Sequence, residues 1–388
     1  MLKCTSVYTC EVDDYKLAMD EINSQLNEKL PLLENTVGIV MCHIEFIDSG
    51  MLKHICESLP FDIAGVTTSS QAVNEMAHDV LLTIFIMTSD DVYFRTGITD
   101  SIIDDVYAPA QAAFDKIDVS EKPKLLMVFP PLPDKHAGDM YVDAWEKVFP
   151  GVPIYGTFST ADTADFSGGS VIYNGESTDT CMSYILCYGN INPRFVVGTF
   201  SDKNALPYQG EITKSNGTIV EEINNIKAYD YFEENELAKD GEPNIIFTFV
   251  PFLIDQKNRQ DYDGVPILRE LVTFNKDGSA VFRGNIDEFS TFKMLLGTFE
   301  DVILIASEKL EEAMSLPDVN GILTFSCIAR RMMVMQRDSL GELVMAKEKI
   351  GDIPFMMGYA GGEICPTSVK DGVATNRYHD YSFITMIV

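Results

Sequence analysis

Apolar segments followed by small residues recur three times along the chain. Each repeat has an apolar strand, a helical stretch and a second short strand that ends in a glycine-containing turn, over residues 37–70, 124–160 and 321–362. Continuous apolar strands indicate a sheet that is covered on both faces, and a crossover helix makes the two strands of such a unit parallel. We therefore predict three βαβ units. Their helices are expected over residues 50–59, 138–149 and 341–350.

Between these units, segments with alternating apolar and polar residues predict antiparallel strands. Residues 80–87 and 92–97 flank a polar turn, and residues 169–173 and 181–188 flank a segment that contains Asn174-Gly175. Turns of this kind favour β-hairpins. We expect an α+β (mixed α/β) fold of two domains, with mixed sheets that contain βαβ units flanked by helices.

The length of the chain predicts more than one domain. Its 388 residues exceed what one hydrophobic core usually supports. A boundary near residue 220 is favoured by a hairpin-like turn at residues 213–218 and a helix-like stretch at residues 228–237, after which residues 244–250 resemble a strand. We predict domains over residues 1–222 and 223–388.

Charge and cysteine content narrow the classes of function. The 59 acidic residues outnumber the 29 basic ones and give a formal charge of −30, which disfavours binding to nucleic acid or to anionic membranes. The eight cysteines show no Cys-x-x-Cys spacing, the N-terminus lacks the apolar core of a signal peptide, and no run approaches the ~18 apolar residues of a membrane span. We expect reduced thiols and a cytoplasmic location.

Polar groups that could line a binding pocket gather near the C-terminus. Residues 326–330 read Ser-Cys-Ile-Ala-Arg, residues 358–366 read Gly-Tyr-Ala-Gly-Gly-Glu-Ile-Cys-Pro, and residues 376–379 read Asn-Arg-Tyr-His. In parallel sheets, ligands bind beyond the carboxyl ends of the strands, where glycines let the backbone approach them. We expect the first two segments to lie side by side around a small hollow. These groups match no common catalytic signature, which favours a receptor over an enzyme.

At these residues the chain resembles the FIST proteins, whose name records F-box and intracellular signal transduction contexts. The Cys-x-x-Arg and Gly-x-x-x-Gly-Glu pair near the C-terminus is the more specific part of the resemblance. The matching segments are residues 63–68, 152–156, 325–330, 358–363 and 376–388. The resemblance implies a FIST N-like domain followed by a FIST C-like domain, in a sensory module of bacterial signalling proteins that binds small ligands such as amino acids or their derivatives.

Two positions depart from the family pattern as we read it. Ala329 stands where glycine is expected before the arginine, and Asp380 stands where asparagine often follows the histidine. The shape of the pocket and the identity of the ligand therefore cannot be carried over from the family. The first predicted domain begins almost at Met1, so we expect any signal to pass to a separate protein partner.

Arg330 and Glu363 are the first candidates for ligand contact. A guanidinium offers a planar fork of donors for a ligand carboxylate, and Glu363 could accept a ligand ammonium group, which together would form a clamp for an amino acid. A structural ion pair of Arg330 with Glu363 or Asp352 is an equally good reading. Gly361 and Gly362 are included as backbone-forming members of the same site.

Further candidates support two different functions. Thr67 and Thr68 offer hydroxyls and amides at a strand end, as a carboxylate or phosphate cradle does. Cys327 with His379 invites an alternative reading as a cysteine-dependent hydrolase or transferase, with Cys365 as a second candidate thiol. A buried cysteine is more often a packing residue, so packing or ligand contact is preferred over catalysis for Cys327 and His379.

The preferred hypothesis is a cytoplasmic sensory protein that binds a small polar ligand. No cofactor, metal ion or nucleic acid is expected: histidines are few, and neither a dinucleotide fingerprint nor a phosphate-binding lysine motif is present. A third reading, a scaffold that binds proteins through its acidic surface, stays open. The oligomeric state is not predicted.

Overall fold

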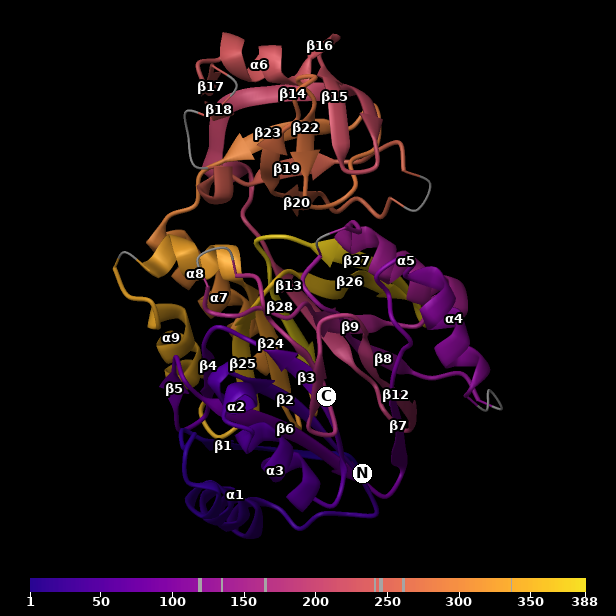
Figure 1. Cartoon of the computed structure of the whole chain (residues 1–388), viewed down its shortest axis with the longest axis vertical. Helices are drawn as coiled ribbons and strands as arrows, with labels where there is room; N and C mark the ends of the chain where they lie inside the picture. The colour runs from indigo at the N-terminus through magenta and orange to yellow at the C-terminus, as the bar shows by residue number, and fades with distance from the viewer. Residues whose placement is uncertain are drawn as a thin grey trace.

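The computed structural model describes the chain except for residues 118–120, 134, 164–165, 241, 244–246, 260–261 and 336. A large lower part, here called the body, comprises residues 1–198 and 299–388. A smaller upper part, residues 205–295, is inserted between them and is called the β-domain (Figure 1). Both parts combine helices with mixed or antiparallel sheets, which confirms the predicted α+β class.

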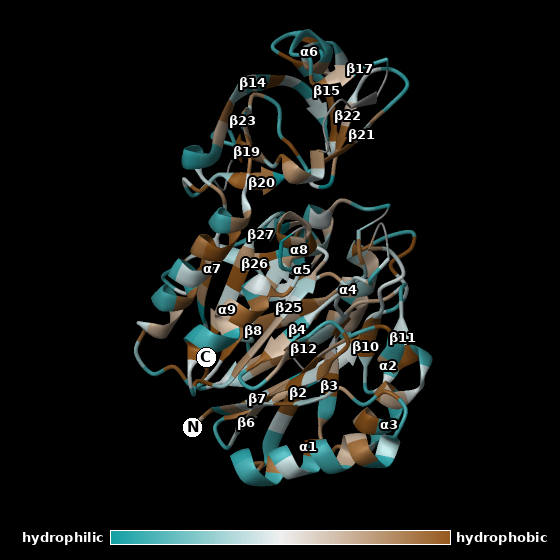
Figure 2. Ribbon diagram, turned by 90° about the vertical axis from the view of Figure 1, so that its left-hand side faces the viewer, coloured by the Kyte–Doolittle hydropathy of each residue, from teal (hydrophilic) through white to brown (hydrophobic). Residues whose placement is uncertain are grey.

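The first sheet of the body contains the first predicted βαβ unit. Its strand order is β1 (Lys3–Thr9), β6 (Leu82–Ser89), β2 (Asn35–Cys42), β3 (Asp62–Thr67), β10 (Val171–Tyr173) and β11 (Glu176–Thr178). Strands β2 and β3 are parallel, as predicted. Helices α1 (Tyr15–Lys29), α2 (Glu45–Asp48) and α3 (Met51–Ser58) pack on one face, and Figure 2 shows α1 turning its hydrophilic side outward.

The second sheet joins strands from the two ends of the chain. Its order is β27 (Val373–His379), β26 (Glu363–Lys370), β9 (Ile154–Thr157), β8 (Leu125–Phe129), β12 (Ser183–Gly189) and β7 (Val92–Ile98). The predicted parallel pair is β8 and β9. Helices α4 (Tyr107–Asp115) and α5 (Gly138–Val148) cover it, with the single tryptophan, Trp145, fully buried between helix and sheet.

The third sheet contains the last predicted unit. Its order is β13 (Arg194–Gly198), β28 (Phe383–Ile387), β24 (Ile322–Cys327), β25 (Phe355–Ala360), β4 (Gln71–Val73) and β5 (Ala77–His78). Strands β24 and β25 are parallel, so this third prediction is also confirmed. The connection between them contains α8 (Ile328–Met335) and α9 (Gly341–Ile350), and α9 packs on this sheet together with α7 (Phe299–Met314).

The β-domain forms a curved antiparallel sheet with its own core. Along this sheet the described strands are β20 (Ile267–Arg269), β19 (Phe252–Asp255), β23 (Thr291–Leu295), β14 (Ala205–Asn216), β15 (Ile219–Ile223), β22 (Ala280–Phe282) and β21 (Leu271–Phe274), with β16 (Ile226–Lys227) beside β15. Around it lie α6 (Ala228–Glu234), the pair β17 (Ala238–Lys239) and β18 (Glu242–Pro243), and the short 3-10 helices η1 (Asp202–Asn204) and η2 (Phe247–Phe249).

Several local predictions are confirmed in the β-domain, and one is wrong. The turn at residues 213–218 joins β14 to β15, and α6 lies within the predicted helix 228–237. The strand expected over residues 244–250 is not seen where it can be checked, because Phe247–Phe249 form η2. Residues 244–246 lie outside the described residues.

The hairpins predicted in the N-terminal half are wrong. Strand β6 pairs with β1 and β2 in the first sheet, whereas β7 pairs with β12 in the second. All residues of β6 are buried, so this strand is stable only at the centre of a sheet, and the turn after it carries the chain into the next sheet. The hairpin around Asn174-Gly175 joins β10 to β11 instead of β12.

Strands from both sides of residue 222 share sheets. Strand β26 pairs with β9, β25 with β4, and β28 with β13. The predicted division between residues 222 and 223 falls inside the β-domain, within β15. The division into domains 1–222 and 223–388 therefore stays a prediction.

The turns that end the three βαβ units converge in the body. Thr160 donates its backbone N–H to the carbonyl of Thr67 at 3.0 Å, and Ser69 donates to the carbonyl of Tyr359 at 3.1 Å. Gly361 donates to the carbonyl of Phe158 at 2.9 Å. The carboxyl ends of β3, β9 and β25 therefore meet, and the β-domain lies above this edge of the body (Figure 1).

Candidate functional site

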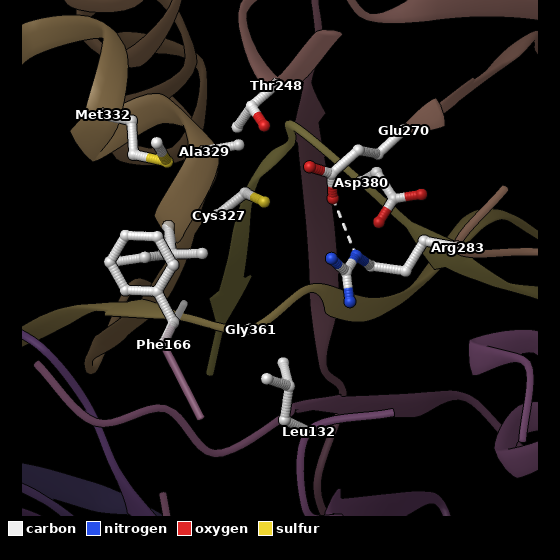
Figure 3. Close-up of a pocket in the computed structure, with 11 residues that line it drawn as sticks. Leu132, Phe166, Thr248, Glu270, Arg283, Cys327, Ala329, Met332, Gly361 and Asp380 are labelled. Atoms are coloured by element: carbon white, nitrogen blue, oxygen red, sulfur yellow. Dashed lines mark hydrogen bonds and ion pairs between the residues drawn. The ribbon is translucent and has the colours of Figure 1, made fainter. Parts of the chain in front are cut away.

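A cavity of about 200 Å³ lies where the β-domain meets the body. The β-domain and η2 contribute its Thr248, Glu270 and Arg283. The remaining lining residues come from the body: Leu132, Phe166, Cys327, Ile328, Ala329, Met332, Gly361 and Asp380. Figure 3 shows the charged side chains on one side of the cavity and Phe166 and Met332 on the other.

The parallel pair β24 and β25 forms the lower wall of the cavity. Cys327, the last residue of β24, lies opposite Ala360, the last residue of β25, and Gly361 follows directly. The thiol-arginine segment and the glycine turn therefore lie side by side at a hollow, as predicted.

Arg283 and Glu270 form an ion pair at the upper wall. Arg283 Nε donates to a Glu270 carboxylate oxygen at 2.7 Å. Burial acts to lower the pKa of Arg283, but Glu270 and other nearby acidic groups outweigh it, so the pKa is raised and the guanidinium is charged. Within the described part of the chain, no group accepts a hydrogen bond from its two terminal nitrogens.

Asp380 presents a half-satisfied carboxylate to the cavity. The hydroxyl of Tyr378 donates to Asp380 Oδ1 at 2.6 Å, whereas Oδ2 has no hydrogen-bond partner among the described residues. The side chain is buried, at 3% exposure. Burial raises the pKa of Asp380 to about 6, although Arg269, the Tyr378 hydroxyl and Arg283 favour the charged form.

Glu363 lies deeper than Asp380 and does not line the cavity. It is fully buried, and the Ser382 hydroxyl donates to one of its oxygens at 2.6 Å, while the other oxygen has no partner in the described structure. Burial raises the pKa of Glu363 well above its usual range, and Asp380 adds to the rise. Burial therefore favours the protonated form of Glu363.

Cys327 lines the cavity as a neutral thiol. Burial raises its pKa well above the usual range, and Glu363 and Asp380 raise it further. Burial lowers the pKa of His379 to about 4, and its Nε2 donates to the carbonyl of Cys365 at 3.0 Å. Among the described residues, no hydrogen bond joins His379 to Cys327 or to the Cys365 thiol, whose pKa burial also raises.

Arg330 occupies a different position from the one expected. Its side chain is fully buried, and its Nη2 donates to Glu342 at 2.6 Å and to the carbonyl of Val302 at 3.0 Å. The guanidinium also lies 5.7 Å from the ring centres of both Phe200 and Phe383. The ion-pair partner is thus Glu342, on α9, and not Glu363 or Asp352. Ligand contact by Arg330 remains a prediction without geometric support.

The other predicted site residues are explained by contacts or backbone conformations within the fold. Thr67 and Thr68 are fully buried, and the Thr67 hydroxyl accepts from the backbone N–H of Ser170 at 2.8 Å. Gly362 has φ +110°, a conformation that side-chain-bearing residues rarely adopt. A Cβ at Gly361 would lie 2.4 Å from Leu132. Of the eight predicted site residues, Cys327 and Gly361 line the cavity.

The charged pair of the β-domain was not predicted from the sequence. Glu270 and Arg283 stand in no motif, and both precede the βαβ unit that drew attention to the C-terminus. Asp380 was visible as a departure from the family pattern, and its acidic side chain was the available signal.

An ion pair between Arg269 and Asp139 joins the β-domain to the body. Arg269 of β20 is fully buried and donates to Asp139 of α5 at 2.8 Å and to the carbonyl of Tyr378 at 3.1 Å. The other Asp139 oxygen accepts from the backbone N–H of Asn285 at 2.7 Å. Tyr378 connects this contact to the cavity, because its ring lies under Arg269 and its hydroxyl binds Asp380.

The sequence matches the FIST N domain over residues 36–226 and the FIST C domain over residues 228–366. The chain therefore belongs to the FIST family, which confirms the predicted resemblance. FIST domains are generally sensory and signal-transduction domains. No curated protein matches the chain.

No helix among the described residues combines the length and the apolar character that crossing a bilayer requires. No group of three or more His, Cys, Asp or Glu side chains in the same residues is placed to share a metal ion.

Proposed function

We propose that this protein is a cytoplasmic sensor that binds a small polar ligand, an amino acid or a derivative, in the cavity between the β-domain and the body. The observation that carries the proposal is that one cavity is lined by both Arg283 and Asp380. Among the described residues, the terminal nitrogens of Arg283 have no acceptor and Asp380 Oδ2 has no donor. A zwitterion offers partners for both groups.

The size of the cavity supports a small metabolite. Pockets for drug-sized ligands typically enclose roughly 300–1,000 Å³, whereas this one encloses about 200 Å³. The proposed site still uses an arginine and a carboxylate to bind the ligand. These are now Arg283 and Asp380, in place of Arg330 and Glu363.

The position of the cavity offers a route from binding to signalling. A ligand that contacts Arg283 and Asp380 bridges the β-domain and the body, and it stabilises the arrangement in which both contacts form. A ligand shifts a conformational equilibrium only by its differential affinity for the two states. We propose that a separate protein partner recognises the bridged arrangement.

Cysteine-dependent catalysis has less support. A nucleophilic cysteine needs a lowered pKa or a nearby base, and the pKa of Cys327 is raised by burial and by two carboxyl groups. His379 is held by a backbone carbonyl.

Thermal unfolding in the presence of the twenty common amino acids and their simple derivatives tests the proposal. A ligand at 100 times its Kd stabilises the folded protein by about 2.7 kcal/mol, which raises Tm measurably. We expect at least one such compound to raise the Tm of the wild type, and Arg283→Gln to abolish the rise.

Arg337→Gln is the matched control, because Arg337 also pairs with a glutamate, Glu300, but is exposed and lies outside the cavity. It should keep the response of the wild type. Absence of any response across the panel, or an unchanged response of Arg283→Gln, would contradict the proposed function.

A further inference from the structure

Asp380 Oδ2 is a buried acceptor that the fold leaves unused. The residue is 3% exposed and lines the cavity, and no described residue donates to this oxygen. An unpaired buried carboxylate oxygen destabilises a protein, because the desolvation of the charge is not offset by hydrogen bonds. Groups of this kind concentrate at functional sites, where a ligand supplies the missing donor.

The charges around the cavity favour a cation. Above pH 6 its wall carries the two negative charges of Glu270 and Asp380 and the single positive charge of Arg283, which leaves one net negative charge. Arg269 and Asp139 neutralise each other nearby. A ligand whose only charge is a carboxylate adds to the negative charge of the wall, whereas an ammonium group balances it.

On the basis of the proposed function, we propose that the obligatory group of the ligand is a protonated amine bound by Asp380, and that its tail is compact and apolar. The carboxylate of an amino acid then contributes a second contact, at Arg283, that a simple amine can lack.

The apolar lining of the cavity determines which ligand tail fits. Its apolar residues are Leu132, Phe166, Ile328, Ala329 and Met332, which offer no charged partner. Figure 3 places Phe166 and Met332 opposite Arg283 and Glu270. A charged or amide-bearing tail would lose its hydration there without compensation, whereas an aliphatic tail of a few carbons gains from burial.

Binding of an amine to Asp380 is linked to protonation. The groups that face Asp380 are Glu270 and Arg283 of the β-domain, Arg269 of β20, Cys327 of β24, Tyr378 of β27, Tyr381 and Glu363. The amine binds the charged form of Asp380. Because the pKa of this carboxyl is raised to about 6 in the free protein, binding near pH 5 must release a proton, and affinity falls as pH decreases below 6.

Calorimetric titration with three matched compounds tests the inference. The probes are leucine, 3-methylbutylamine, which lacks the carboxylate, and 4-methylpentanoate, which lacks the amine. We expect the first two to bind at pH 7.5 and 4-methylpentanoate to bind at least tenfold more weakly than leucine. Lysine and glutamate should also bind at least tenfold more weakly than leucine, because their tails are charged.

Asp380→Asn should weaken the binding of leucine and of 3-methylbutylamine by at least tenfold, since it removes the charge but keeps the size of the side chain. Asp62→Asn is the control, because Asp62 is exposed and its hydrogen bonds with Thr96 and Asn174 lie outside the cavity. In the wild type, titration at pH 5.5 in two buffers of different ionisation enthalpy should show proton release, and at pH 8 it should show none.

The outcomes separate this inference from the proposed function. If 4-methylpentanoate binds as tightly as leucine, or if Asp380→Asn binds leucine normally, the amine subsite is wrong while the cavity stays a ligand site. If leucine binds at pH 5.5 without proton release, Asp380 does not bind the amine, even if Asp380→Asn weakens binding. If none of the five compounds binds but another amino acid derivative raises Tm, the ligand class stated here is wrong. If nothing on the larger panel binds, both proposals fail.

Discussion

At the scale of single residues, the cavity differs from the core around it in how its carboxyl groups are satisfied. The Asp139 carboxylate receives hydrogen bonds from Arg269 and from Asn285, one on each oxygen. Among the described residues, Asp380 and Glu363 each receive a hydrogen bond on one carboxylate oxygen only. Complete satisfaction is typical of a structural carboxylate, whereas Asp380 lines the cavity and is only partly satisfied by the described residues.

Asp380→Asn should stabilise the protein in the absence of ligand at pH 7.5. The folded-state pKa of about 6 lies above the usual value of 3.8, so the folded protein binds this proton more tightly than the unfolded chain does. The contribution of Asp380 to stability is thus fully present below pH 4 and is lost as pH rises through 6. An uncharged asparagine avoids the loss, which corresponds to about 2–3 kcal/mol.

Urea unfolding followed by the fluorescence of Trp145 checks this at pH 7.5 and at pH 4. The variant should gain stability at pH 7.5 and show little difference at pH 4. Equal or lower stability at pH 7.5 would show that the charge of Asp380 is compensated within the protein.

Arg330→Ala should lower stability without changing the affinity of the folded protein for ligand. The substitution leaves Glu342 buried without its partner, which typically costs about 3–5 kcal/mol. Arg337→Ala, which removes an exposed ion pair, should cost less than about 1 kcal/mol. Urea unfolding and leucine titration below the unfolding transition measure both effects. A stable Arg330→Ala protein that no longer binds ligand would restore the predicted contact of Arg330.

At the scale of helices and strands, local sequence patterns predicted the order of the elements but not which strands pair. The order strand, helix, strand, glycine turn is encoded in neighbouring residues, and all three βαβ units were predicted. The partner of β6 is decided by the burial of both its faces, which the polar turn at residues 88–91 does not reveal. Likewise, whether Arg330 faces a ligand or Glu342 depends on how α8 packs against α9.

The contact between α5 and β20 positions one wall of the cavity relative to the other. Gly284 follows Arg283 directly, and a Cβ there would lie 2.6 Å from Arg269 and 2.8 Å from Asp139. The ion pair of Arg269 with Asp139 therefore needs a glycine next to the arginine of the cavity. Disturbance of this pair should move Arg283 away from Asp380.

Asp139→Asn should weaken both the docking of the β-domain and the binding of ligand. It leaves the fully buried Arg269 without a charged partner, whereas Asp202→Asn removes only the exposed pair with Lys293. Amide hydrogen exchange of residues 267–285 should become faster in Asp139→Asn, and leucine affinity should fall at least tenfold. Asp202→Asn should resemble the wild type. Unchanged exchange and affinity in Asp139→Asn would show that docking does not depend on this pair.

At the scale of the whole molecule, the body is built from both ends of the chain and the β-domain is built from one segment. The central core of the body combines residues such as Val37 and Met127 with Phe325 and Met386. The core of the β-domain contains only residues between 206 and 294. The fold class and the family were predicted from the sequence, but the shared sheets depend on strand partners more than 180 residues apart, for which local pattern holds no signal.

This difference predicts how fragments behave. A fragment of residues 1–222 should fail to fold, because β4, β9 and β13 lose β25, β26 and β28 as partners. A fragment of residues 199–298 should fold, because it retains its own core. Circular dichroism and limited proteolysis check both. A cooperatively folded 1–222 fragment would support the predicted division between residues 222 and 223.

The most direct measurement is a crystal structure of the protein with leucine, or with the tightest ligand from the thermal panel. We predict ligand density in the cavity between the β-domain and the body, with the amine within hydrogen-bond distance of Asp380 Oδ2 and the tail against Phe166 and Met332. Ligand density elsewhere, with this cavity empty, would contradict it.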